Sequence, residues 1–523
     1  MKTQENVTDT LKLLHKGSGK LYLLCVAVGA ITGFIVSLYR LVLEHTNAFR
    51  KMIIEDSVFK GPQFIFIVWI AFILIGFIVD YIAKKYPKIS GSGIPQVKGI
   101  LLRQLDYTKW FQELVAKFVS GVMGIGAGLS LGREGPSVQI GSYVAFGATK
   151  LFDRDIVEKK YLITSGASAG LAGAFGAPLS GVMFALEELH RFISAKLLIC
   201  AFLASIASNF MGRRLFGSAT SFDLIALYPN DLNPYYQFTL YIILGIIIAF
   251  LGKLFTVMLL KAQDIYKTNK VPRWFKVSCV MSSSLLLCYF LPEVTGGGHT
   301  LVEEMVTGKN TISILVLIFI LKLLFTVFSY ATGFAGGIFL PMLVLGAVVG
   351  KIYAIILIRY LNFPPEFVSH FMVLGMAGYF VAVVRAPITG AVLILEMTGN
   401  FDHLLALATV SVIAYYITDI LGVEPVYELL YERMAKDTPD EKVHIGKKTL
   451  ISIPVVGDSE LDGKKVSELA IPEDVLLVSI RRNDHDIIPK NSMVIRGGDL
   501  LVFLIPKEKA FAMKEELVKE GSN

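Results

Sequence analysis

Long apolar runs separated by short polar breaks dominate the sequence up to about residue 432. The longest runs are close to the roughly 20 residues that an α-helix needs to cross a bilayer, and they lie at residues 21–43, 64–79, 238–260, 312–328 and 404–421. Only 18% of the 523 residues are charged, whereas a soluble globular domain carries about 25% charged residues. The pattern therefore predicts an all-α polytopic membrane protein in a lipid bilayer.

The pattern changes after Ala435. A charged segment, KDTPDEKVHIGKK, is followed by the short aliphatic or β-branched runs ISIPVV, VLLVSI and LLVFLI, which predict strands separated by glycine turns. KKVSEL and AFAMKEELVK predict short helices, giving the approximate order β-α-β-β-β-α. We therefore expect two domains, a transmembrane transport domain over residues 1–436 and a small α/β cytoplasmic domain over residues 445–519.

Several apolar stretches of the membrane part are shorter than a full span because Gly and Pro interrupt them. The interruptions are GSGIP (91–95), GREGP (132–136), GAP (176–178), GGIFLP (336–341) and RAP (385–387). Discontinuous helices at matched positions in two halves of a chain point to the substrate site of a transporter.

The two halves do share a repeat. The spacing G-x3-P-x4-G occurs at residues 132–141 and again 205 residues later, at residues 337–346. Further along, APLSGVMFALEE (177–188) aligns with APITGAVLILEM (386–397). Chance similarity between apolar helices is the alternative, but two ordered matches at nearly the same offset favour a duplicated, two-halved transporter.

The repeat also distinguishes two neighbouring carboxylates. Glu187 pairs with Glu396, whereas Glu188 pairs with Met397. A carboxylate present in both halves is expected to be structural, for example by capping a neighbouring helix. Glu188 has no counterpart in the second half, so we predict a functional role for it.

The Gly-Pro interruptions predict an anion site. GSGIP, GREGP and GGIFLP each resemble a helix start, because Gly lets the backbone bend and Pro is favoured in the first turn. A helix start exposes unpaired N–H groups and a partial positive charge, which attract anions. Three starts that met would bind an anion weakly enough to release it, and Ser92 would add a hydroxyl donor. For any one motif alone, an ordinary kink is the simpler interpretation.

Glu134 lies inside one of these helix starts. An ionised carboxylate there would compete with a transported anion, whereas a protonated one would have no charge to hold it, so proton binding and anion binding would be coupled. A first-turn carboxylate that merely complements the helix dipole is the alternative. Sequence alone gives no physical reason for the neighbouring Arg133.

Composition bears on the other classes of partner. The net charge of +7 raises the question of nucleic-acid binding. Lys and Arg are scattered through loops and termini, as the positive-inside rule explains, so no nucleic-acid partner is expected.

The first twenty residues are polar without a signal-peptide core, so we expect a cytoplasmic N-terminus. The four cysteines and eight histidines show no disulfide or metal spacing, and no nucleophile–base set stands out. We therefore predict no enzyme, cofactor or metal.

Four motifs together resemble one family. GSGIP (91–95), GREGP (132–136), GIFLP (337–341) and Tyr427 in EPVYELL occur in the order typical of the CLC family of chloride channels and chloride/proton exchangers. The resemblance covers about residues 10–436. The combination is highly specific, although none of the four motifs would be alone.

The resemblance implies a homodimer with one anion pathway per subunit, built from inverted-topology repeats of tilted, partly re-entrant helices. It implies that the hydroxyl groups of Ser92 and Tyr427 and the backbone amides of Ile338 and Phe339 bind the anion. It implies that Glu134 is the external gate, which also carries protons. The wider anion-path motifs that it implies consist of Gly91, Gly93, Ile94, Pro95, Gly132, Arg133, Gly135, Pro136, Gly337 and Pro341.

Glu188, in FALEELHR, resembles the internal proton-transfer glutamate of the exchangers. Passive channels of the family typically lack an acid there, so Glu188 favours a secondary active antiporter that exchanges chloride for protons. A passive voltage- or pH-gated chloride channel on the same scaffold is the alternative. Ser92 fits chloride, because the resemblance associates Pro at this position with nitrate and other residues with fluoride.

The C-terminal stretch IPKNSMVIRGGDLLVFLIP resembles the TrkA-C (RCK-C) part of potassium-conductance regulators. Such modules commonly dimerise and some bind small ligands, so a small-molecule or nucleotide ligand is a candidate partner. A sensor or subunit of a potassium transporter is a rival interpretation, but it predicts a carbonyl filter of the TVGYG type, which the sequence does not contain. We expect an integral protein of a prokaryotic cell membrane, with both termini cytoplasmic.

Overall fold

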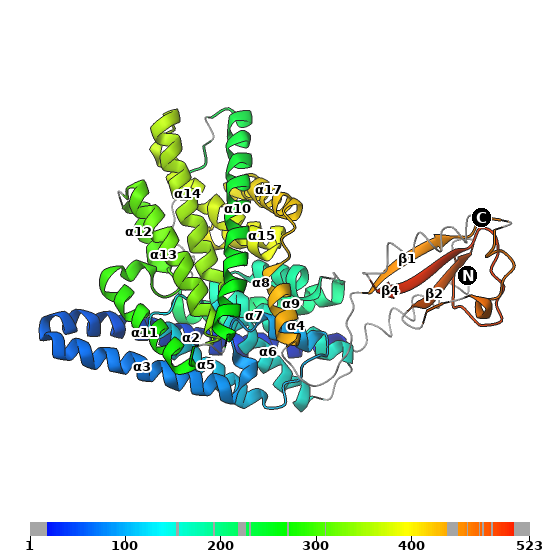
Figure 1. The fold of residues 1–523 in the computed structure, drawn as a ribbon, viewed down its shortest axis with the longest axis horizontal. Coiled ribbons are helices and arrows are strands. Elements are labelled where there is room, and N and C mark those ends of the chain that lie inside the picture. Colours follow the sequence, from blue (N-terminus) through cyan, green and yellow to red (C-terminus); the bar gives the residue numbers. More distant parts are fainter. Residues whose placement is uncertain are drawn as a thin grey trace. The chain divides into compact units, whose positions relative to one another are not determined.

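A computed structural model of the chain describes residues 18–152, 156–191, 194–217, 226–229, 232–268, 271–308, 310–436, 448–457, 459–469, 471–472, 475–482 and 485–506. The chain divides into two compact units, Met1–Asp437 and Thr438–Asn523. Each unit is described by itself below (Figure 1).

The first unit is helical, and its helices form two successive series. The first series is α2 (Ser18–Lys60), α3 (Pro62–Lys85), the 3-10 turn η1 (Pro87–Ile89), α4 (Ile94–Leu101), α5 (Trp110–Gly126), α6 (Glu134–Leu151), α7 (Ile156–Phe175), α8 (Pro178–Phe184), the π-helical turn η2 (Ala185–His190) and α9 (Ala195–Phe216).

The second series is α10 (Pro234–Lys267), α11 (Arg273–Phe290), η3 (Pro292–Val294), α12 (His299–Thr307), α13 (Ile312–Ala331), α14 (Phe339–Leu361), η4 (Pro365–Phe367), α15 (Val368–Val384), α16 (Pro387–Thr398), η5 (Phe401–His403) and α17 (Leu404–Ile420). A further helix, α18 (Val426–Lys436), follows both series.

Among the described residues, eight helices are long and apolar enough to cross a membrane. They are Gly19–Lys60, Pro62–Lys85, Ala195–Phe216, Pro234–Lys267, Ile312–Ala331, Phe339–Leu361, Pro365–Val384 and Phe401–Ile420. The five apolar runs of the sequence lie within these helices or end beside them, so the expected spans are confirmed. Most side chains of α3 face outward, whereas α15 is enclosed by its neighbours, with buried side chains from Ser369 to Val384.

The repeat seen in the sequence is present in the structure. η1 and η3 begin 205 residues apart, and so do α4 and α12, and α6 and α14. Two buried lysine residues follow the same offset: Lys117 Nζ donates to the carbonyl oxygens of Ile89 and Gly91, at 2.8 and 2.7 Å, and Lys322 Nζ donates to the matching carbonyls at 2.9 and 2.8 Å. The duplicated architecture is therefore confirmed.

All five Gly-Pro interruptions precede a helix start. They lie immediately before or across the first residues of α4, α6, α8, α14 and α16. Gly93 shows the local reason, because it precedes α4 with φ of 93°, in the left-handed region that other residues rarely adopt. Pro95 then occupies the first turn, where a missing N–H removes no helical hydrogen bond.

The second unit contains one antiparallel sheet, with strand order β1-β4-β2-β3. Its strands are β1 (Lys448–Pro454), β2 (Leu476–Arg482), β3 (His485–Ile487) and β4 (Leu500–Pro506). The three predicted strands are confirmed, and their alternate residues, such as Ile453, Ile480 and Leu501, form the buried core. KKVSEL forms only the 3-10 turn η6 (Val466–Glu468). The predicted helix AFAMKEELVK lies outside the described residues.

Candidate functional site

The starts of α6 and α14 are joined directly. Gly132 and Gly337, each two residues before its helix, form an antiparallel bridge in which each amide donates to the other carbonyl, at 2.7 and 2.8 Å. The two backbone segments run in opposite directions there, as expected for inverted halves. A Cβ on Gly337 would lie 3.2 Å from the amide nitrogen of Gly135. The bridge therefore places two helix N-termini side by side.

The start of α4 lies at the same place. The amide of Gly91 donates to the carbonyl of Gly333 at 3.2 Å, and the amide of Gly336 donates to the carbonyl of Gly91 at 3.1 Å. From the other side, Gly135 lies so close to Ser92 that a Cβ there would collide with Ser92 Oγ. The structure thus brings together the three helix starts that the sequence singled out.

Ser92 and Tyr427 supply two hydroxyl groups to this region. Both residues are buried, and within the described part of the chain neither Ser92 Oγ nor Tyr427 Oη has a hydrogen-bond partner. Tyr427 lies next to Ser92, because α18 packs against α4. Tyr330, which the sequence analysis missed, adds a third hydroxyl group beside Gly91. It lies on α13 in an apolar run, so its position gave no signal.

Glu134 is the first residue of α6 and is only 1% exposed. Its Oε2 atom has no hydrogen-bond partner among the residues that the structure describes. That atom lies against Gly132, and the amide nitrogen of Leu340 in the first turn of α14 lies against the same glycine. The carboxylate is therefore held where the two helix N-termini meet.

Arg133, which sequence reasoning left unexplained, reaches toward α2. Its Nη1 atom lies 3.9 Å from Glu44 Oε1, and Glu44 is also bound by Arg40 at 2.7 Å. Its Nη2 atom donates to the carbonyl of Ala174 at 3.5 Å. Arg133 thus connects the loop before α6 to α2 and α7.

Ile338 is the N-cap of α14 and Phe339 is its first residue, and both are buried. The first amides of a helix have no acceptor within the helix, so these two N–H groups are available donors. The Phe339 ring packs against Phe175, Phe184 and Phe380, with centroid distances of 5.2, 6.1 and 4.7 Å. This aromatic cluster gives the helix start an apolar wall.

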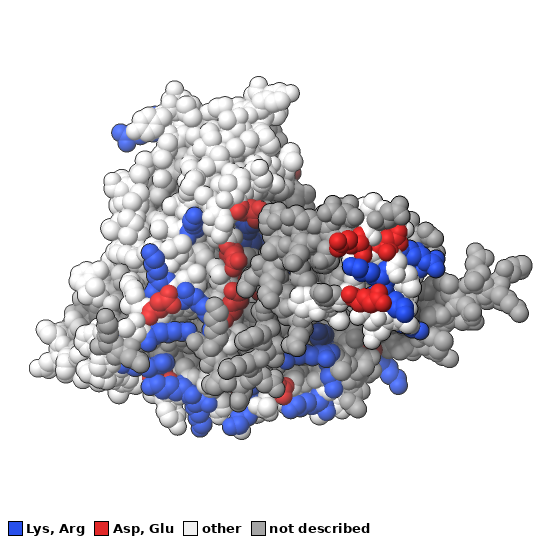
Figure 2. Space-filling model, turned by 45° about the vertical axis from the view of Figure 1, so that its right-hand side comes forward, with Lys and Arg blue, Asp and Glu red and all other residues white. Residues whose placement is uncertain are grey.

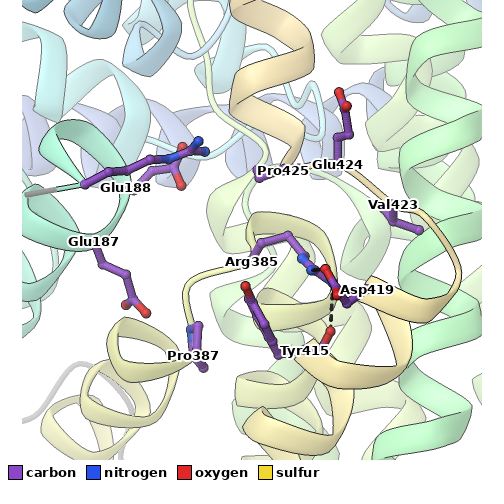
Figure 3. Close-up of a pocket in the computed structure, with 10 residues that line it drawn as sticks. Glu187, Glu188, Arg385, Pro387, Tyr415, Asp419, Val423, Glu424 and Pro425 are labelled. Carbon is purple, nitrogen blue, oxygen red and sulfur yellow. Dashed lines mark hydrogen bonds and ion pairs between the residues drawn. The ribbon is translucent and has the colours of Figure 1, made fainter. Parts of the chain in front are cut away.

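Glu188 lies in η2 and is 2% exposed, and none of the described residues forms a hydrogen bond with its Oε1 atom. It lines a pocket of about 490 Å³. Figure 3 shows Glu188 on one side of this pocket and Arg385, bound to Asp419, on the other. The lining residues are Glu187, Glu188, Arg191, Arg385, Pro387, Tyr415, Asp419, Val423, Glu424 and Pro425.

The neighbouring Glu187 has a different role. Its carboxylate accepts from the amide and hydroxyl of Thr389 at the start of α16, at 2.8 and 2.7 Å. Glu396 accepts in the same way from the amide and hydroxyl of Ser180 at the start of α8, at 2.7 and 2.5 Å. The repeat thus forms two reciprocal helix caps, and the predicted structural role of this carboxylate pair is confirmed.

Comparison with known proteins agrees with this architecture. Residues 75–419, about two-thirds of the chain, match the family described as voltage gated chloride channel. The chain belongs to the CLC family. Within it, the H(+)/Cl(-) exchange transporter ClcA of Vibrio parahaemolyticus is 32% identical over 443 residues, which cover 82% of this chain and 92% of that protein. The transporter of the same name from Cronobacter sakazakii is 32% identical over 435 residues, or 81% and 92%.

Solved CLC structures share the fold. A slow cyanobacterial Cl−/H+ antiporter aligns with a TM-score of 0.73 and 30% identity, over 80% of this chain and 98% of that one. A eukaryotic CLC transporter aligns with a TM-score of 0.66 and 21% identity, over 80% and 74%, which bears on the fold alone. The expected inverted-repeat CLC fold is thereby confirmed. Residues 450–517 match the TrkA-C domain, as the resemblance of the tail implied.

Proposed function

We propose that this CLC protein is a secondary active antiporter that exchanges chloride for protons. The observation that carries the proposal is that two elements with a buried glutamate pack against α4, the helix that follows Ser92. They are α6, which begins at Glu134, and η2, which carries Glu188, and Tyr427 lies within electrostatic reach of both carboxylates. Each glutamate has a buried carboxylate oxygen without a hydrogen-bond partner among the described residues. An anion path alone needs no such groups, whereas a proton path requires protonatable groups within the protein.

In this proposal chloride is bound by the hydroxyl groups of Ser92 and Tyr427 and by the backbone amides of Ile338 and Phe339. These are neutral donors, and the start of α14 adds the partial positive charge of a helix N-terminus. Such a site attracts an anion without a full counter-charge, so chloride can leave again during each transport cycle.

Glu134 gates the site from the start of α6. Its ionised carboxylate satisfies the same helix N-termini that attract chloride, so the two compete for one region. Protonation removes that attraction and lets the side chain leave. Proton binding at Glu134 and chloride binding are thereby linked, which a passive anion pathway does not require.

Glu188 exchanges protons with water in the pocket that it lines. Its burial keeps it next to Tyr427, and the pocket gives it access to solvent. The passive channel remains the rival on this scaffold. The exchange activity named for the relatives from Vibrio parahaemolyticus and Cronobacter sakazakii supports the antiporter.

We further propose that the chain acts as a homodimer in a prokaryotic cell membrane, with residues 1–436 carrying transport and residues 445–519 regulating it. Figure 2 shows Lys and Arg side chains gathered along the lower edge of the helical unit, some acidic and basic side chains at mid-height, and a largely uncharged upper part of that unit. An edge rich in basic residues is typical of the cytoplasmic side, where we place both termini. The TrkA-C match supports a small-molecule or nucleotide ligand for the second domain.

Purified protein in vesicles tests the proposed function. With an imposed chloride gradient and no proton gradient, chloride efflux should drive protons uphill, and the same vesicles without protein should show neither flux. Robust chloride flux without proton movement would replace the antiporter with the channel.

A further inference from the structure

An ion pair connects the two helices that carry the hydroxyl donors. Lys98 lies on the second turn of α4, the helix that follows Ser92, and Glu428 directly follows Tyr427 on α18. Lys98 Nζ donates to Glu428 Oε2, and the two side chains are only 7% and 18% exposed. Water therefore screens this pair much less than a surface ion pair.

A second cation shares the same carboxylate. Arg191 Nη2 lies 3.2 Å from Glu428 Oε2. Arg191 follows η2 directly and takes φ of 52°, in the left-handed region. The ion pair of Arg191 with Glu428 connects the segment that carries Glu188 to α18. We call Lys98, Arg191 and Glu428 the α4–α18 charge cluster.

The turn η2, which carries Glu188, packs against α4, and Glu188 and Arg191 line the same pocket. Glu188 is therefore near the α4–α18 charge cluster, attracted by Lys98 and Arg191 and repelled by Glu428. With Glu188 ionised, two cations face two carboxylates. With Glu188 protonated, both cations have Glu428 as their only carboxylate in the cluster. A proton on Glu188 thus changes the charge balance around the ion pair that joins α4 to α18.

The other charged groups around Glu188 have partners elsewhere. Glu187 caps α16, and Arg385 binds Asp419 on the side of the pocket opposite Glu188. Among the described residues, the other titratable or charged groups near this turn or in the pocket include His190 on η2, Lys160 on α7, Tyr415 on α17, Glu424 after α17 and Tyr427 on α18. The α4–α18 charge cluster is therefore the set that responds most directly to Glu188.

Building on the proposed function, we propose that the α4–α18 charge cluster couples the proton on Glu188 to chloride binding, with Lys98 as the positioning residue. When Glu188 is protonated, Lys98 and Arg191 both bind Glu428, which holds α18 against α4 and keeps the Tyr427 and Ser92 hydroxyls on the anion. When Glu188 is ionised, it competes for the two cations. The contact between α4 and α18 then weakens and chloride is released.

Replacement of Lys98 tests this role. In vesicles containing the full-length protein, Lys98→Met should move fewer protons per chloride than wild type. The chloride dissociation constant, measured by calorimetry, should rise by about fivefold or more. Lys98→Arg, which keeps the charge, should restore most of the proton-to-chloride ratio and most of the chloride affinity. Glu428→Gln should resemble Lys98→Met. A merely structural lysine would lower both fluxes together and leave their ratio unchanged.

The matched control lies on α18, the helix that carries Glu428. Arg433 of α18 pairs with Asp264 of α10 at 2.6 Å, away from Glu188. Arg433→Met should therefore keep the wild-type ratio of protons to chloride. A wild-type ratio and wild-type chloride affinity in both Lys98→Met and Glu428→Gln would overturn the inference and leave the antiporter intact. If wild type itself moves no protons, the proposed function fails instead.

Discussion

Glu134 and Phe339 occupy equivalent positions in the two halves, 205 residues apart, each as the first residue of its helix. One carries a carboxylate next to the bridge between Gly132 and Gly337, and the other carries a ring packed among three phenylalanines. The backbone is duplicated at this point, but the chemistry is not. A protonatable side chain, which we propose as the gate, therefore lies at only one of these two helix starts.

The residue-scale prediction concerns this gate. Glu134→Gln keeps the shape of the side chain but removes its ability to gain and lose a proton. Chloride transport should therefore continue, while coupled proton transport should fall at least about tenfold, toward the leak of protein-free vesicles. Paired chloride and proton fluxes check this. Uphill proton transport at the wild-type rate in this variant would remove Glu134 from the gate.

At the scale of elements, close approach between helix starts shapes the anion site. A Cβ on Gly135 would collide with Ser92 Oγ, so Gly135→Ala should displace that hydroxyl and weaken chloride binding by roughly tenfold, or about 1.4 kcal/mol. Gly124→Ala is the matched control, because its Cβ would meet only a Leu129 atom at 3.9 Å. Equal chloride affinities of the two variants in calorimetry would contradict this packing.

The reciprocal caps predict a different phenotype. Glu396→Gln weakens a charged acceptor at the start of α8 and should destabilise the protein by about 1–3 kcal/mol. The ratio of protons to chloride should remain that of wild type, because Glu396 is not part of the proton path. Thermal unfolding in detergent and the paired flux assay check both statements. A changed ratio at normal stability would assign Glu396 a transport role.

Much of this architecture was predictable from sequence because it depends on local backbone requirements. Three Gly-Pro interruptions, GSGIP, GREGP and GGIFLP, predicted helix starts, and the mismatch of Glu188 with Met397 separated it from the capping Glu187. The charge cluster was not predictable, since Lys98 and Glu428 lie 330 residues apart and meet only when α18 packs on α4. The buried Lys117 also gave no signal, because its partners are backbone carbonyl oxygens.

At the scale of the whole molecule, the second unit contains its own ion pair with a buried carboxylate, between Asp499 and Arg482. Asp499 is 1% exposed and accepts two hydrogen bonds from Arg482, both at 2.7 Å. Burial acts to raise the pKa of Asp499, but the hydrogen bonds from Arg482 and the Arg496 amide outweigh it and hold the pKa below its ordinary value of 3.8. A lowered folded-state pKa stabilises the fold above the unfolded value, and this stability is lost as the pH falls through the folded value.

Asp499→Asn should therefore destabilise the C-terminal sheet at neutral pH, and the difference from wild type should shrink below about pH 4. Hydrogen exchange of residues 500–506 in the intact protein measures this difference. Asp486→Asn is the control, because that aspartate forms an exposed pair with Arg481. A difference between wild type and Asp499→Asn that does not depend on pH would contradict the assigned ion pair.

The central claim is that one chain moves chloride and protons in opposite directions through sites that meet at Tyr427. Paired chloride and proton fluxes, measured in the same vesicles for wild type and Glu188→Gln, test it most directly. Wild type should drive protons uphill against a chloride gradient, while Glu188→Gln should transport chloride and move no protons. Chloride flux without proton movement in wild type, or normal proton coupling in Glu188→Gln, would contradict the account.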